Sequence, residues 1–316
     1  MSVFENVINE VNKKNEVKDV TPESVEVADE GEGKKSFPER MAEKKNQCYA
    51  MIDDACLNAV SSIESLRQFL NVQSRFDKYS LNNALLIFEQ KPDAVKLKEL
   101  AAWNKEDISV KKGAKSIMIL EPSPYKGTDG KIHRGYNAKN VFDISDVEAP
   151  EDALPQPKSY EQKQLVAALV HDAPVPVCKA EKSLGEHNAI YDAKNKVVYF
   201  KAGLEFDAIF PAIAKALAHA EMAKDVENYR IGEHEFAARC SAYVLSQRYG
   251  VDTRTVDVYG IPKNFETMEA EDVKKVLGDV HSNVKTINAR MNESLEQTQN
   301  KEQQTPNKGN KNREER

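Results

Sequence analysis

Basic and aromatic side chains gather between positions 76 and 115, and this mixture could bind a nucleic acid. From position 96 to 115 six lysines stand against three acidic residues, although the whole chain carries a net charge of −6. Gly113 lies among three of these lysines and can take the positive φ of a tight turn that presents them to phosphates. Trp103, Tyr79, Phe76 and Tyr136 are candidate platforms on which bases would stack.

Polar side chains at the start of a predicted helix could add to this surface. Ser80 suits the N-cap of a helix over 81–91, which Pro92 ends because it disfavours helical backbone at the residue before it. Asn82 and Asn83 follow the cap, where free backbone N–H groups favour anions. The sequence therefore predicts a DNA-binding site formed by Tyr79, Ser80, Asn82, Asn83, Gln90, Trp103, Lys111, Lys112 and Lys115. The alternative is that the lysines form an ordinary solvated face while the aromatic residues close a small core.

The order of predicted elements is that of an α+β chain with two folded domains. Proline-rich residues 149–158 form a linker between a first block, 38–148, and a second block, 159–297. The first block is expected to hold helices over 39–71 and 81–91, strands over 116–121 and 140–144, and a turn-rich stretch over 125–134. The second is expected to hold helices over 160–171, 207–224, 233–249 and 270–297 and a hairpin over 188–201. An acidic leader, 1–37, and a polar tail, 298–316, are expected to be disordered.

The last predicted helix carries an apolar seam. Its members recur at steps of three and four: Val273, Leu277, Val280, Val284, Ile287 and Met291. Such a heptad seam can dock on the protein's own domain or on a helix of a partner protein.

Composition limits the class of protein. The chain has no apolar run near the roughly 18 residues of a membrane span and no apolar signal core at its N-terminus. The four cysteines, at positions 48, 56, 178 and 240, include no Cys-x-x-Cys pair, so we expect reduced thiols. The acidic balance argues against a protein that binds polyanions over its whole surface. We expect a cytoplasmic protein with no membrane contact.

Several of these motifs together resemble the N-terminal domain of ArdC-type antirestriction proteins. The resemblance rests on Tyr79-Ser80-x-x-Asn83, the apolar run after it, Gln90-x-Pro92-x-Ala94, Trp103 and the turn Val110-Lys111-Lys112-Gly113, and it continues through 117–122 and 141–145. It implies that this block binds single-stranded DNA and that the protein belongs to a plasmid or other mobile element, with a role in antirestriction or conjugation. Residues 104–108 depart from the pattern, because they are more acidic and lack a glycine before the basic turn.

Proteins of that family often carry a second domain similar to a zinc metalloprotease, with His-Glu-x-x-His on a helix. The two histidines bind the metal from one helix face, and the glutamate acts as general base on the bound water. The matching residues here are His219, Ala220 and Ala223, so two of the groups that the chemistry needs are replaced by alanine. Glu235 matches the segment that would supply a third ligand. The resemblance therefore implies a catalytically inactive domain without metal or cofactor, in which His219 is a hydrogen-bonded interior residue.

Two other functions remain open from the sequence. The first is an active zinc metallohydrolase with a rewired site. Glu221 does not support it, since two positions from His219 is roughly 200° around a helix, whereas the sequence does not fix where His234 lies. The second is a pure interaction protein whose helix over 270–297 pairs with a partner and whose first block binds no DNA.

Overall fold

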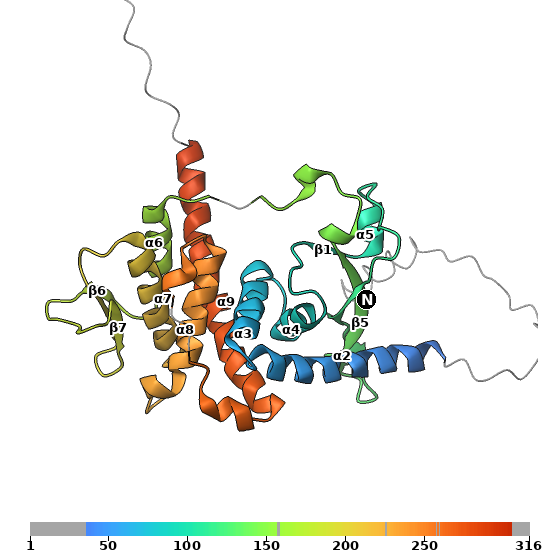
Figure 1. The fold of residues 1–316 in the computed structure, drawn as a ribbon, viewed down its shortest axis with the longest axis horizontal. Coiled ribbons are helices and arrows are strands. Elements are labelled where there is room, and N and C mark those ends of the chain that lie inside the picture. Colours follow the sequence, from blue (N-terminus) through green and yellow to red (C-terminus); the bar gives the residue numbers. More distant parts are fainter. Residues whose placement is uncertain (1–35, 157–158, 225, 257, 259, 305–316) are drawn as a thin grey trace, which may run out of the picture. The chain divides into compact units, whose positions relative to one another are not determined.

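The structure, a computed structural model, describes residues 36–156, 159–224, 226–256, 258 and 260–304 (Figure 1). Nearly all of the predicted leader and the end of the predicted tail lie outside these residues. The described part is α+β, as the sequence predicts. No helix in the described part of the chain is both long and apolar enough to span a membrane.

The first block begins with two helices where the sequence predicts one over 39–71. Helix α2 (Phe37–Ala59) ends before a break at residues 60–62, and α3 (Ile63–Arg75) starts after it. Ser62 is the N-cap of α3, and its hydroxyl accepts a hydrogen bond from the backbone N–H of Ser65 at 3.0 Å. The prediction of a continuous helix was wrong because a favourable serine cap restarts the helix within an unbroken apolar pattern.

A short helix and a small antiparallel sheet complete this block. Helix α4 (Leu81–Gln90) has the predicted Ser80 cap, and α5 (Leu100–Asn104) is a single turn. The strands are β1 (Leu97–Lys98), β2 (Ile117–Pro122), β3 (Tyr125–Lys126), β4 (Ile132–His133) and β5 (Tyr136–Asp143). The sheet order is β1-β5-β2, with β5 central, and β3 pairs with β4 farther out. Both predicted strands are therefore confirmed, and they pair directly.

The second block is mainly helical. Its elements are α6 (Gln162–Val170), β6 (Val177–Lys179), β7 (Ala189–Asp192), β8 (Val197–Phe200), α7 (Phe206–Met222), α8 (Ile231–Arg248) and α9 (Ala270–Gln304). The predicted hairpin is β7–β8, and the sequence did not indicate β6, which runs parallel to β8 on its other side. Helix α9 continues to Gln304, past residue 297, where the sequence places the start of the tail.

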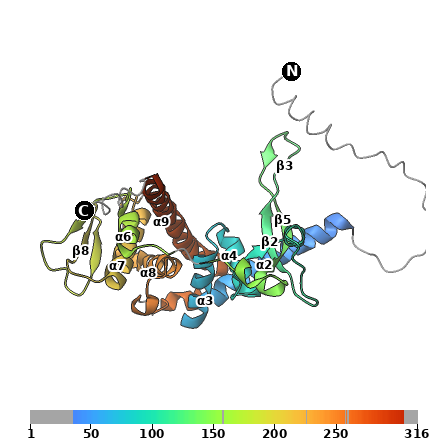
Figure 2. The same cartoon turned by 90° about the horizontal axis from the view of Figure 1, so that it is seen from above.

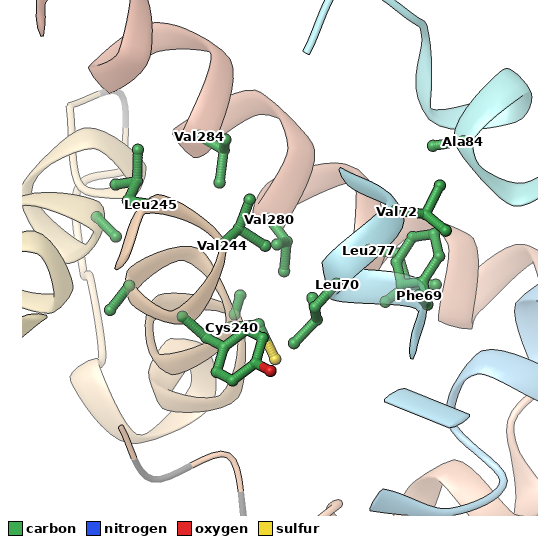
Figure 3. Packing of buried hydrophobic residues seen from close by; sticks show 14 of the residues in the cluster. Phe69, Leu70, Val72, Ala84, Cys240, Val244, Leu245, Leu277, Val280 and Val284 are labelled. Carbon is green, nitrogen blue, oxygen red and sulfur yellow. The ribbon is translucent and has the colours of Figure 1, made fainter. Parts of the chain in front are cut away.

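One hydrophobic core runs through both blocks. Figure 3 shows Phe69 of α3 beside Leu277 of α9, and Val244 of α8 beside Val280 of α9, all within one cluster. All six predicted seam residues of α9 are buried in this core, with exposed fractions of 6% or less. The seam therefore docks on the protein's own helices, and it is not available to pair with a helix of a partner protein.

Polar contacts follow the same junction between α3 and α8. The Arg248 guanidinium lies 2.7 Å from an Asp77 carboxylate oxygen and donates to the Ser74 carbonyl at 3.0 Å. The Tyr243 hydroxyl donates to the Asn71 side-chain oxygen at 3.2 Å. A fragment that ended before α8 would expose the apolar face of α3 and leave these groups without partners, so binding experiments require the full chain.

Candidate functional site

Two predicted DNA-binding residues of α4 instead hold the edge of the sheet. The Asn83 amide donates to the Leu120 carbonyl at 2.9 Å and accepts from the Leu120 N–H at 2.8 Å. Gln90 does the same at Met118, with both distances 2.8 Å. Positions 83 and 90 are seven residues apart and share one face of α4. The two amides thus act in place of a neighbouring strand along the otherwise open edge of β2.

The other predicted residues near the start of α4 are more accessible. Ser80 is exposed and caps the helix by accepting from the Asn83 N–H at 3.3 Å. Asn82 is half-buried, and within the described residues its side chain makes no hydrogen bond. Tyr79 is half-buried against Phe76, with ring centroids 5.5 Å apart and ring planes at 90°, and burial raises the pKa of its hydroxyl.

Trp103 is completely buried. It forms a small core with Ile108, Ile144 and Val147, and its indole N–H donates to the Phe142 carbonyl at 3.1 Å. The Lys98 ammonium group lies 4.7 Å from the ring centroid. Neither face of the indole ring is open to a base in this conformation, so the position of Trp103 matches the alternative interpretation, in which aromatic residues close a small core.

The three lysines of the predicted turn are exposed. The Ala114 N–H donates to the Lys111 carbonyl at 3.1 Å, and Gly113 has φ +84°, the positive value that a type II turn requires at its third residue. Lys111 also donates from its ammonium group to the Ser145 carbonyl at 3.0 Å. Among the described residues no carboxylate lies within ion-pair distance of Lys111, Lys112 or Lys115. We call residues 110–115 the basic turn.

The basic turn and the α4 N-terminus adjoin opposite ends of β2. Lys115 lies two residues before Ile117, where β2 begins, whereas Asn83 is bonded to Leu120 near its other end. Sequence reasoning placed all nine residues in one site. The structure brings together the amides and β2, leaves the lysines exposed at one end, and removes Trp103 from the surface.

An exposed hairpin beyond Leu120 was left out of the predicted site, although its Tyr136 was among the candidate stacking platforms. Residues 122–136, here called the arm, carry three large exposed side chains: Tyr125 (57% exposed), Ile132 (80%) and Tyr136 (40%). The arm also bears Lys126, Lys131 and Arg134 against one carboxylate, that of Asp129. The signal was present in the sequence as basic and apolar residues that alternate on both sides of Asp129-Gly130.

In the second block, the buried His219 lies at the centre of a partly buried hydrogen-bond network. Its side chain is 3% exposed. The Nδ1 atom lies 2.7 Å from the Tyr229 hydroxyl, and Nε2 lies 2.9 Å from a Glu235 carboxylate oxygen. The other Glu235 oxygen accepts from the Lys215 ammonium group at 3.0 Å. Lys215 and His219 are four residues apart on α7, which puts both side chains on the face that meets α8. The expectation that His219 is a hydrogen-bonded interior histidine is confirmed.

The chemistry of this network fixes its protons. Burial would by itself raise the pKa of Glu235, but hydrogen bonds from His219 and Lys215 lower it to about 2, so the carboxylate is ionised and can only accept. The His219 Nε2 must then carry a proton. Burial raises the pKa of Tyr229, so the hydroxyl beside Nδ1 stays protonated.

These residues do not fit a catalytic metal ion. Zinc sites need at least three protein ligands, and only His219 and Glu235 meet here. The His219 Nε2 carries a proton that it donates to Glu235, and the other Glu235 oxygen accepts from the Lys215 ammonium group. A metal would have to displace both of these hydrogen bonds. The two rewiring candidates point elsewhere: Glu221 pairs with Arg290 and Lys224, and the His234 ring stacks on Tyr229 at 4.7 Å. Among the described residues no three His, Cys, Asp or Glu side chains are placed to hold a metal.

A cavity of about 610 Å³ lies beside the network. Lys215 and Glu235 form part of its wall, together with Asp207, Pro211 and Arg239. The Arg239 guanidinium lies 3.9 Å from the Glu235 carboxylate, so the cavity wall carries both charge signs.

Comparison with solved structures identifies the fold. The chain is similar to the crystal structure of the antirestriction ArdC protein from the R388 plasmid in its Mn(II)-bound form, with a TM-score of 0.53, 10% sequence identity, and coverage of 78% of this chain and 98% of that chain. The metal-free structure of that protein matches with a TM-score of 0.47 at 11% identity, over 68% of this chain and 85% of that chain. No protein-family model and no curated protein matches. The resemblance to ArdC that the sequence motifs suggest is thus confirmed for the fold.

Proposed function

We propose that this protein binds single-stranded DNA through its first block and serves a plasmid or other mobile element, in antirestriction or during conjugation. In this proposal the second block is a catalytically inactive metallopeptidase-like domain. Cytoplasmic residence belongs to the same proposal, because that is where incoming DNA meets restriction enzymes.

The observation that carries the proposal is the basic turn. Three exposed lysines on six residues, without carboxylate partners among the described residues, form a local positive surface on a chain of net charge −6. Elsewhere in the first block, Lys91 lies 3.2 Å from Asp146, and Lys139 is paired with Glu99 and Glu121 at 2.6 and 2.7 Å. Lysines left unpaired can neutralise phosphates and release the counterions of a nucleic acid.

The fold supports the plasmid and antirestriction part. The solved structure that this chain resembles over 78% of its length is named as an antirestriction protein of the R388 plasmid. A shared fold supports a shared role, but the function itself depends on the residues of the site. The basic turn is the charged part of the predicted site, and it is exposed here.

The composition of the His219 network supports the inactive second block. The neighbour's structure is described as Mn(II)-bound, whereas this chain offers two ligand side chains, and the Lys215 ammonium group already neutralises one of them. The alternative of a metallohydrolase with a rewired site would need a third ligand and a general base, and neither Glu221 nor His234 is placed to be one.

Fluorescence anisotropy of the full chain with a labelled single-stranded oligonucleotide, titrated against salt, tests the DNA-binding part. We expect binding that weakens with salt and a preference over a duplex of equal length. Lys111→Ala/Lys112→Ala should reduce the slope of log K against log salt by about 0.7 for each phosphate contact that is lost. Lys194→Ala/Lys196→Ala, which removes the same charge from an exposed turn of the second block, should bind like the wild type. Equal losses in both variants, or no binding at low salt, would overturn the proposal.

Metal analysis tests the inactive-domain part. Protein incubated with Mn²⁺ or Zn²⁺ and then desalted should retain far less than one ion per chain. A melting temperature that rises with either metal would show preferential binding to the folded state. That result, or one retained ion per chain that is lost on His219→Ala, would favour the rewired metallohydrolase.

A further inference from the structure

The arm continues the ladder formed by β2 and β5. Every pair from Ile117–Val141 to Lys126–Ile132 has the same register, and the backbone bonds Ser123 N–H to Gly135 and Gly127 N–H to Lys131 bridge the gaps between assigned strands. The tip closes in three residues, with Gly130 at φ +76°, as in hairpins that combine a type I turn with a bulge. At about 3.4 Å per residue, the ribbon extends roughly 17 Å beyond Pro122. Figure 2 shows β3 standing clear of the helices.

The constant register sorts the arm's side chains onto two faces. Directly opposed residues share a face, and successive residues alternate. The odd-numbered face holds Tyr125 opposite His133, and the even-numbered face holds Lys126 opposite Ile132. The even face continues inward with Pro124 opposite Arg134 and Pro122 opposite Tyr136.

The odd-numbered face is occupied by contacts within the arm. The Tyr125 and His133 rings stack with centroids 5.6 Å apart, and His133 Nε2 lies 2.9 Å from the Asp129 carboxylate. These rings also cover two glycines: a Cβ at Gly127 would lie 2.5 Å from the His133 ring, and one at Gly135 would lie 3.0 Å from the Tyr125 ring. The odd-numbered face therefore stiffens the arm.

The even-numbered face has no such internal partners. Lys126 and Arg134 are exposed there, next to Ile132 and Tyr136, which are 80% and 40% exposed. No carboxylate occupies any even-numbered position from 118 to 126 or from 132 to 140. Cations thus alternate with an aromatic and an aliphatic side chain on a stiff ribbon that projects into solvent.

We propose that the even-numbered face of the arm holds single-stranded nucleic acid, with Lys126 and Arg134 on phosphates and Tyr136 and Ile132 under bases. The inference rests on the proposed function and adds a second contact surface at the other end of β2 from the basic turn. Cations interleaved with flat or apolar platforms are how proteins hold single strands without reading their sequence.

Two other occupants fit the arm less well. A two-stranded ribbon can enter the major groove of duplex DNA, where Lys126 and Arg134 could pair with base edges, but a duplex keeps its bases stacked on one another and offers none to the exposed Tyr136 ring. A protein strand could add to the ribbon's edge, but Pro122 and Pro124 remove outward N–H groups from the edge formed by β2 and β3.

A matched pair of lysines on opposite faces tests the inference in the full chain. Lys126→Ala and Lys131→Ala remove the same side chain on either side of the arm's tip, and both residues are exposed. Anisotropy with a single-stranded oligonucleotide should show that Lys126→Ala and Arg134→Ala each lower the salt slope by about 0.7. Tyr136→Ala should weaken binding by about fivefold or more. Lys131→Ala should bind like the wild type. All four variants should melt like the wild type, since the arm lies outside the core.

The outcomes separate this inference from the proposed function. If the wild type binds single strands and responds to Lys111→Ala/Lys112→Ala, but the even-face variants bind normally, the arm inference fails and the proposed function stands. Equal losses in Lys126→Ala and Lys131→Ala would also overturn it, because the effect would then be charge alone. If the even-face variants lose binding to duplex DNA and not to single strands, the face binds duplex DNA, and the claim that it holds a single strand is wrong. If the wild type binds no single strand at low salt, both fail.

Discussion

Two carboxylates, the buried Asp143 in the first block and the half-buried Glu235 in the second, show how differently polar groups are used in this protein. Asp143 of β5 is 1% exposed and accepts from the N–H groups of Val95, Lys96 and Ser145 and from the Ser145 hydroxyl, at 2.7 to 3.0 Å. Glu235 of α8 accepts from two side chains, His219 and Lys215, beside a cavity.

The difference separates a carboxylate held mainly by backbone donors from one held by side chains alone. Backbone donors cannot move without the chain, so Asp143 fixes the loop before β1 against the end of β5. Side-chain donors can move to other partners or to water, so the Glu235 network can lose a member at lower cost. The exposed lysines of the basic turn are a third case, because within the described residues they pair with no carboxylate.

The largest effect is expected at the backbone-bound carboxylate. Asp143→Ala should lower the free energy of unfolding by roughly 3–5 kcal/mol, because several donors lose a charged acceptor at once. Glu148→Ala, an exposed carboxylate five residues later, should change it by less than about 0.5 kcal/mol. Urea unfolding of the full chain measures both. Similar small losses in the two variants would mean that Asp143 is not structural.

The same carboxylate gives a pH signature. Burial alone would raise the pKa of Asp143, but its hydrogen bonds from Ser145, Val95 and Lys96 hold it below the ordinary value. Its stabilisation is therefore complete above the unfolded pKa of about 3.9 and is lost as pH falls through the lower folded value. The difference in unfolding free energy between the wild type and Asp143→Asn should shrink as pH falls below about 4. A difference that grows on acidification would contradict this sign.

A smaller loss is expected at the sheet edge. Asn83→Ala removes the partner of both the N–H and the carbonyl of Leu120, which should cost roughly 2–3 kcal/mol. Asn82→Ala is the control. The Asn82 side-chain amide makes no hydrogen bond within the described residues, so this substitution should cost less than about 0.5 kcal/mol. If both variants unfold at the same urea concentration, the amide is not closing the edge of β2.

A still smaller loss is expected in the second block. His219→Ala should cost about 1–2 kcal/mol, because Glu235 keeps its bond to Lys215 and the Tyr229 hydroxyl can turn to a water. The variant Lys224→Ala, which removes an exposed partner of Glu221, provides a surface reference in the turn just after α7. A loss at His219 as large as that at Asp143 would remove the distinction between the two kinds of carboxylate.

Sequence patterns predicted most elements of the fold, because caps and periodicity are local. Ser80 capped the expected helix, Gly113 took the expected positive φ, and the seam of α9 was buried. The break between α2 and α3 was missed because Val60-Ser61-Ser62 interrupts no apolar spacing. The parallel strand β6 was missed because its pairing is set by β8, twenty residues later in the chain.

The candidate site could be predicted only in part, because residue type does not reveal exposure. Asn83, Gln90 and the basic-turn lysines look equally suited to a nucleic acid in the sequence, yet the amides bind the backbone of β2 and the lysines face solvent. The arm was overlooked because its two faces exist only once the register pairs Lys126 with Ile132. The His219 network needed Lys215 and Tyr229, which no metal-ligand spacing would single out.

The smallest effect on stability is expected at the basic turn, where an unchanged stability would separate a role in binding from a role in the fold. Lys111→Ala/Lys112→Ala should change the free energy of unfolding by less than about 0.5 kcal/mol, because both ammonium groups are exposed and one bond to a carbonyl is lost. The same variant should lose affinity for single-stranded DNA. Buried polar groups here should affect folding and leave binding by the folded protein intact, and exposed cations should do the reverse. A lysine variant that unfolded at a lower urea concentration than the wild type would show that the basic turn also stabilises the fold, and the contrast between the regions would be lost.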